Sequence, residues 1–190
     1  MIKFDVQDFF ESITEIDAFR VFRDRGYQAL VAFELARLCT RLRDKHRVPT
    51  SYLPSRRRSR YRGPDIEALY PRKHLGVLPQ GAPTSPMLSN LAVSDLDANL
   101  NLIAEKFGLR YSRYADDLTF STTKKSFGRS NSIRLVGEIY QEIIARGLSP
   151  NRSKTSIIAP GARKVVLGLL VDGQRPRLTR EFRSRLRMHL

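Results

Sequence analysis

The stretch that decides the fold is YADDLTFS, residues 114–121, which places two acidic residues directly before an alternating apolar run. Together with residues 109–113 it forms two short alternating segments, a pattern that predicts a β-hairpin with the acidic pair at or near its tip. The carboxylates of Asp116 and Asp117 repel each other unless a positive group lies nearby. That group can be a Lys or Arg side chain, a helix N-terminus or a divalent metal ion.

Regular elements are predicted on both sides of this hairpin. Apolar spacing and end signals predict strands over residues 1–10, 154–159 and 164–171, and helices over residues 15–42, 85–107 and 133–145. Thr14 is the expected N-cap of the first helix, and Gly26 is a candidate break within it. This order of elements predicts an α+β fold, an antiparallel sheet with helices packed on one face.

Composition indicates a polyanionic partner. The chain of 190 residues carries 34 Lys and Arg against 19 Asp and Glu, a formal net charge of +15. Lys and Arg that neutralise phosphates release condensed counterions, which favours nucleic acid as the partner. The only cysteine, Cys39, excludes an internal disulfide, and we find no signal peptide pattern and no apolar run of membrane-spanning length. A cytoplasmic protein without a membrane partner is expected.

A third carboxylate is expected beside the acidic pair. Asp5 interrupts an otherwise apolar strand, and the fold can bring this strand next to the hairpin. The alternative is that Asp116 and Asp117 only favour a turn, where Asp side chains bond the local backbone. Three converging carboxylates need cations, and Mg²⁺ prefers oxygen ligands of this kind. Two such ions about 3.5 to 4 Å apart can clamp the attacking and leaving oxygens of a phosphoryl displacement.

Five ordered motifs resemble those of a known family. They are FDVQDFF (residues 4–10), LPQGAPTSPMLSN (78–90), YADDLTFS (114–121), LSPNRSKT (148–155) and VLGLLVDG (166–173). They resemble the palm motifs of reverse transcriptases, most closely the bacterial retron type, with group II intron and defence-associated relatives as alternatives. The resemblance implies an RNA-directed DNA polymerase that uses two Mg²⁺ ions, for which Mn²⁺ can substitute. It further implies an RNA template, a DNA or RNA primer, deoxynucleoside triphosphates, a cognate structured non-coding RNA and a role in antiviral defence.

The resemblance also implies roles for individual residues. Asp5 and Asp116 would be the principal metal ligands, with Asp117 as an auxiliary carboxylate and the backbone carbonyl of Val6 as a further ligand. The other implied sites are the nucleotide site (Phe10, Gln80, Gly81, Tyr114 and Lys154), the primer site (Leu167, Gly168 and Leu169) and the contacts to the nucleic-acid backbone (Arg56, Arg57, Arg58 and Arg60).

Each of these assignments has a structural alternative. Phe10 would exclude a ribose 2′-hydroxyl and select deoxynucleotides, but it can equally be a core side chain. Gln80 and Gly81 can form a plain turn, and Lys154 can be an ordinary surface lysine. Residues 166–173 can be an apolar strand pair, and the arginines of residues 56–60 can belong to a solvated loop.

The motif positions predict a division of the chain into four parts. Residues 1–16 and 80–173 would form the palm, residues 17–79 a fingers-like insertion of helices and a basic loop, and residues 174–190 the start of a truncated thumb. Relatives carry a longer fingers region before the first motif and a full thumb after the last. A nucleic-acid-binding palm fragment without turnover is therefore the alternative to an enzyme.

Overall fold

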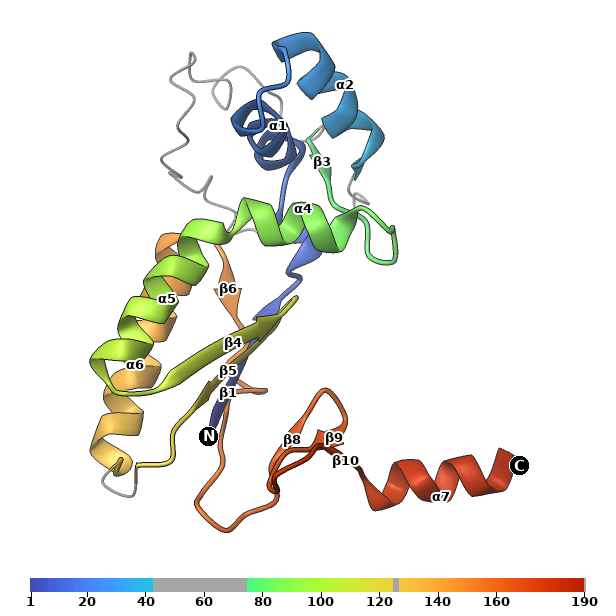
Figure 1. Cartoon of the computed structure of the whole chain (residues 1–190). Helices are drawn as coiled ribbons and strands as arrows, with labels where there is room; N and C mark the ends of the chain where they lie inside the picture. The colour runs from blue at the N-terminus through green and yellow to red at the C-terminus, as the bar shows by residue number, and fades with distance from the viewer. Residues whose placement is uncertain (43–74, 125–126, 190) are drawn as a thin grey trace.

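A computed structural model describes residues 1–42, 75–124 and 127–189, and its main sheet is antiparallel (Figure 1). The strand order is β4-β5-β1-β6, and β7 also pairs with β1. These strands are β1 (Ile2–Gln7), β4 (Arg110–Tyr114), β5 (Asp117–Ser121), β6 (Ser149–Pro150) and β7 (Ser156–Ile157). The first strand therefore lies inside the sheet, between the hairpin and two short strands from later in the chain.

The predicted hairpin is confirmed. Strands β4 and β5 pair from Arg110 opposite Ser121 to Tyr114 opposite Asp117, so Ala115 and Asp116 form the turn. Ala115 has φ +51°, a left-handed conformation that is uncommon for a residue with a Cβ atom. The acidic pair thus spans the turn and the first residue of β5.

Two long helices pack on one side of this sheet, as Figure 1 shows: α5 (Ser94–Lys106) and α6 (Arg129–Ala145). Their buried residues join the strands in one apolar core, in which Phe4 of β1 meets Phe120 of β5 edge-to-face at 5.5 Å between ring centroids. Leu100 of α5 and Ile139 of α6 are fully buried in the same cluster. The α+β prediction with helices on one face of the sheet is confirmed.

The helix predicted over residues 85–107 is wrong in one respect, because the structure contains two helices there. Helix α4 (Ser85–Ala92) ends at Val93, and α5 begins at the next residue. Val93 is 1% exposed and leaves helical geometry, with φ −106° and ψ +16°. Leu88, Ala92, Leu96, Leu100 and Ala104 continue the four-residue spacing across the junction, so the apolar pattern does not reveal the break.

The helices before α4 follow the sequence signals more closely, although the second of them ends at Leu38 and residues 41 and 42 form a strand instead of continuing the predicted helix. Helix α1 (Glu15–Asp24) starts at a capping box in which Thr14 and Asp17 exchange side-chain and backbone hydrogen bonds. Gly26, at φ +93°, separates α1 from α2 (Ala29–Leu38), as predicted. The N-cap is confirmed because Thr14 satisfies donors that the first helical turn leaves without partners.

Apart from one ten-residue helix, the remaining elements have two or three residues each. They are the 3₁₀ turn η1 (Phe10–Ser12), β2 (Arg41–Leu42), β3 (Gly76–Val77), β8 (Val165–Val166), β9 (Leu169–Leu170), β10 (Arg177–Leu178) and α7 (Arg180–His189). Strands β8, β9 and β10 form a separate small sheet. Within the described ranges, no helix has the length and apolar character needed to cross a bilayer. The four-part division of the chain stays a prediction.

Candidate active site

The sheet brings the acid of the first motif next to the acids of the hairpin. Asp5 lies opposite Asp117 in the antiparallel pairing of β1 with β5. One residue further along, the Val6 N–H donates to the carbonyl of Asp116 at 3.1 Å. The acids of two distant motifs are therefore neighbours at the turn end of the hairpin, because β1 pairs directly with β5.

Lys154 is the positive partner of this group in the structure. Its Nζ donates to Oδ2 of Asp5 at 3.0 Å. The backbone nearby is fixed as well, since the Asn151 N–H donates to the Asp5 carbonyl at 2.8 Å. Of the countercharges that the sequence allows, a lysine is thus the one that contacts an acid of this cluster, and it comes from the fourth motif.

The charges of the four side chains influence one another. Burial raises the pKa of the Asp116 carboxyl above 3.8, and the negative charges of Asp5 and Asp117 raise it further, while Lys154 lowers it. The hydrogen bond to Asp5 raises the pKa of the Lys154 ammonium, and the charges of Asp116 and Asp117 act in the same direction. Burial is the largest cause of the raised Asp116 pKa, and the neighbouring charges act on this carboxyl in opposite directions.

The donor set fits a divalent cation in its chemistry, since carboxylate oxygens are what hard cations prefer. In the described parts of the chain, however, no group of three or more His, Cys, Asp or Glu side chains is arranged so that it could hold a metal ion. The Asp5 carboxylate instead contacts Lys154, so a cation would have to compete with that ammonium group. The metal-ligand assignment stays a prediction.

Asp116→Asn should stabilise the metal-free chain at neutral pH. The Asp116 carboxyl has a higher pKa in the folded chain than in the unfolded chain, so the folded state binds more protons between pH 3.8 and the raised value. The folded chain therefore loses stability as the pH rises through this interval. Removing the carboxyl should therefore raise the thermal unfolding midpoint at pH 7 and give no such gain below pH 3.8. Circular dichroism melts in a chelator at both pH values measure this difference. An equal shift at both pH values would contradict it.

The predicted nucleotide-site residues lie on nearby elements. Phe10 begins η1, is partly buried against the core and meets Phe9 at 5.6 Å between ring centroids. Gln80 and Gly81 are exposed in the loop before α4, and Gly81 has φ +91°, which a glycine adopts without strain. Tyr114 at the end of β4 is 67% exposed. Their roles stay predictions.

The predicted primer-site residues form a second tight turn. Leu167 and Gly168, with φ +49° and φ +79°, connect β8 to β9, and both are exposed. Leu169 begins β9 and is 37% exposed. The predicted backbone contacts Arg56, Arg57, Arg58 and Arg60 lie outside the described residues.

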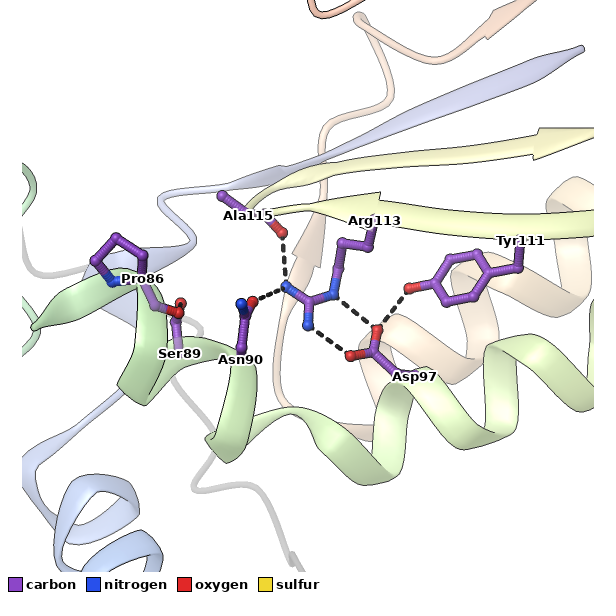
Figure 2. A network of polar contacts seen from close by, with 7 residues as sticks. All are labelled: Pro86, Ser89, Asn90, Asp97, Tyr111, Arg113 and Ala115. Carbon is purple, nitrogen blue, oxygen red and sulfur yellow. Dashed lines mark hydrogen bonds and ion pairs between the residues drawn. The ribbon is translucent and has the colours of Figure 1, made fainter.

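Sequence reasoning did not single out two residues that the structure joins to the hairpin turn. Arg113 of β4 and Asp97 of α5 form an ion pair, and Arg113 also donates to the carbonyl of Ala115 at 3.1 Å (Figure 2). The available signal is the alternation of the sequence, which puts Arg113 on the same face of the strand as Leu109 and Tyr111. In the structure, Tyr111 and Arg113 are indeed less exposed than their neighbours in β4. This pattern places a charged arginine side chain on the half-buried face, directly before the YADD stretch.

Comparisons with known proteins identify relatives over nearly the whole chain. The retron Ec86 reverse transcriptase of Escherichia coli is 29% identical over 187 residues, covering 98% of this chain and 47% of that protein. The retron Mx162 reverse transcriptase of Myxococcus xanthus is 31% identical, covering 90% of this chain and 34% of that protein. The retron Mx65 reverse transcriptase of the same organism is 34% identical, covering 100% of this chain and 40% of that protein.

The chain thus spans less than half the length of these curated relatives. Among solved structures, telomerase from Candida albicans in complex with a fragment of telomeric RNA aligns with a TM-score of 0.49 and 13% identity, covering 90% of this chain and 28% of that one. The family of reverse transcriptases (RNA-dependent DNA polymerases) matches residues 1–176. The predicted resemblance is confirmed: this chain belongs to the reverse transcriptase family, and it is similar to the retron enzymes.

Proposed function

We propose that this chain is the palm of an RNA-directed DNA polymerase of retron type, which adds deoxynucleotides to a primer hydroxyl on an RNA template. The observation that carries the proposal is the pairing of β1 with β5, which sets Asp5 opposite Asp117 and bonds Val6 to Asp116. Family membership and the net charge of +15 support a nucleic-acid substrate.

In this proposal Asp5 and Asp116 hold two divalent ions, Mg²⁺ in the cell and Mn²⁺ as a substitute, with Asp117 and the Val6 carbonyl as auxiliary ligands. Bound ions would supply positive charge that favours ionisation of the primer 3′-hydroxyl and compensates the charge on departing pyrophosphate. The protein's own contribution is to keep the acids at the turn end of one sheet, where Asp116 already carries a raised pKa.

Lys154 has a second role in this proposal. Its ammonium group neutralises Asp5 while no substrate is bound, at a distance of 3.0 Å. A divalent ion held by Asp5 would displace this ammonium group, and Lys154 would then be free to neutralise or protonate the departing pyrophosphate. The position supports such a movement because the Lys154 side chain is 63% exposed and its backbone is fixed by a neighbouring bond to β1.

The other motif residues complete the substrate site in this proposal. Phe10 lies under the incoming sugar and excludes a 2′-hydroxyl. Gln80, Gly81 and Tyr114 lie against the incoming nucleotide and the template base. The turn at residues 167–169 holds the primer end, and the basic residues 56–60 contact the nucleic-acid backbone. The same proposal includes a cytoplasmic, bacterial location, a cognate structured RNA and a role in antiviral defence.

Primer extension tests the proposal directly. The purified chain should extend a labelled DNA primer on an RNA template when supplied with deoxynucleoside triphosphates and Mg²⁺, and a chelator should stop extension. Binding to the same primed RNA should weaken with rising salt. If the chain binds the primed RNA and never extends it, the protein is instead a palm that binds nucleic acid without turnover.

A further inference from the structure

A buried guanidinium connects the acidic turn to the helices behind the sheet (Figure 2). Arg113 Nε donates to Oδ1 of Asp97 at 2.7 Å, and Nη2 donates to the other carboxylate oxygen. Nη1 donates to Oδ1 of Asn90 at 2.9 Å and to the carbonyl of Ala115 at 3.1 Å. One side chain thus contacts α4, α5 and the turn that carries Asp116.

This arrangement is rigid for physical reasons. The Arg113 side chain is only 6% exposed, and the two-pronged contact with Asp97 fixes the plane of the guanidinium. Tyr111 donates its hydroxyl to Oδ1 of Asp97 at 2.7 Å, which holds the carboxylate from a second side. The guanidinium carbon also lies 5.7 Å from the centre of the Phe9 ring, directly before Phe10. Because the guanidinium is held by all these contacts, it stays in one place and offers the turn a fixed hydrogen-bond donor.

The bond to Ala115 falls where the hairpin most needs support. Ala115 holds a left-handed φ of +51°, which costs free energy for a residue with a Cβ atom. Its carbonyl accepts from Arg113, and the carbonyl of the next residue, Asp116, accepts from Val6. The turn is therefore bonded on one side to the helices through Arg113 and on the other side to β1.

We propose that Arg113, oriented by Asp97, is a positioning residue that fixes the Ala115–Asp116 turn and so sets the Asp116 carboxylate for polymerisation. The catalytic part of this inference rests on the proposed function. The structural part does not, because a fixed turn can be measured in the absence of substrate. If Arg113 served only stability, its replacement would loosen the whole shared core, including α1, and not the turn alone.

The test compares Arg113→Lys with Arg110→Lys on the same strand, where Arg110 is exposed. Lysine keeps the charge but cannot form the planar fork to Asp97 or reach Ala115 at the same time. Amide hydrogen exchange by NMR in the metal-free chain is the first readout. In Arg113→Lys the Val6 amide, bonded to Asp116, should exchange about tenfold faster, and the Ala18 amide in α1 should stay within about twofold. Arg110→Lys should leave both unchanged.

Primer extension is the second readout. In Arg113→Lys we expect kcat to fall about 10- to 100-fold while KM for the deoxynucleotide changes by less than about threefold, because a displaced catalytic group lowers the rate more than binding. Arg110→Lys should keep both constants within about twofold. If Arg113→Lys does not fold, Asp97→Asn takes its place, since it keeps an oxygen acceptor and should speed Val6 exchange about threefold.

The outcomes separate the two proposals. Unchanged Val6 exchange in a folded Arg113→Lys variant overturns the positioning role, and so does equal acceleration at Val6 and Ala18. If the wild-type chain does not extend a primer, the proposed function is wrong, yet local acceleration at Val6 still supports the fixed turn. If the wild type extends and Arg113→Lys extends at the same rate, the proposed function stands and the positioning role is overturned.

Discussion

Asp116→Asn is expected to lower the rate of primer extension by at least about 10³-fold. The carboxylate is proposed to hold a divalent ion, and the charge stabilisation from such an ion contributes several kcal/mol to the barrier, with each 1.4 kcal/mol worth about tenfold. Asn keeps the size of the side chain and an oxygen, so the turn between Tyr114 and Asp117 should survive. Single-turnover extension of a labelled primer at saturating deoxynucleotide measures the loss.

The same variant should bind primed RNA as well as the wild-type chain does. Removing a negative charge does not remove any contact to phosphate, so the affinity and its salt dependence should be kept. Asp24→Asn, the same chemical change at an exposed position near the end of α1, serves as the matched control and should extend at the wild-type rate. Residual extension within tenfold of wild type would show that Asp116 is not a ligand of the reacting centre.

Phe10→Ala is expected to weaken the preference for deoxynucleotides over ribonucleotides about 10- to 100-fold. The ring is proposed to occupy the space that a ribose 2′-hydroxyl needs, and a steric contact of this size discriminates by roughly that factor. Phe10 begins η1, shortly after β1 ends at Gln7, and its ring contacts Phe9. Competing incorporation of matched deoxy- and ribonucleoside triphosphates gives the ratio of kcat/KM values.

Phe33→Ala, at a 44% exposed phenylalanine on α2, is the matched control and should leave the ratio unchanged. Phe10 is partly buried against the core, so some loss of stability is expected in Phe10→Ala, and the ratio is measured on folded protein. If the incorporation of both nucleotides falls equally, then Phe10 is a core side chain, the alternative that its sequence context leaves open.

The elements that sequence predicts well here are those with local signals. The hairpin over residues 109–122 follows from alternation, and the start of α1 follows from Thr14 and Asp17, which satisfy each other within one turn. The break at Val93 was missed because apolar spacing runs through it. A change of helix direction depends on how the core closes around Val93, and this information is not present in any short window of sequence.

For the candidate site, too, local signals were predicted and contacts between distant residues were not. Motif order was enough to select Asp5, Asp116 and Lys154, but not to show that Lys154 pairs with Asp5, since 149 positions separate them. The sequence does not single out Arg113, because the chain contains many arginines and only the fold shows that this one pairs with Asp97. The sequence thus identifies which residues matter when a motif surrounds them, and pairings between distant residues appear only in the folded chain.

The inner position of β1 has a consequence for how the protein is made. Its strand partners in the described ranges begin only at residue 117, and Lys154 follows later still. A ribosome adding about 5 to 20 residues per second needs roughly 5 to 20 s to pass from one partner strand to the other. This strand is synthesised before all of these partners, and its sheet cannot close until they follow. Contacts of such long sequence separation predict slow folding, so nascent chains of this protein should depend on chaperones during that interval.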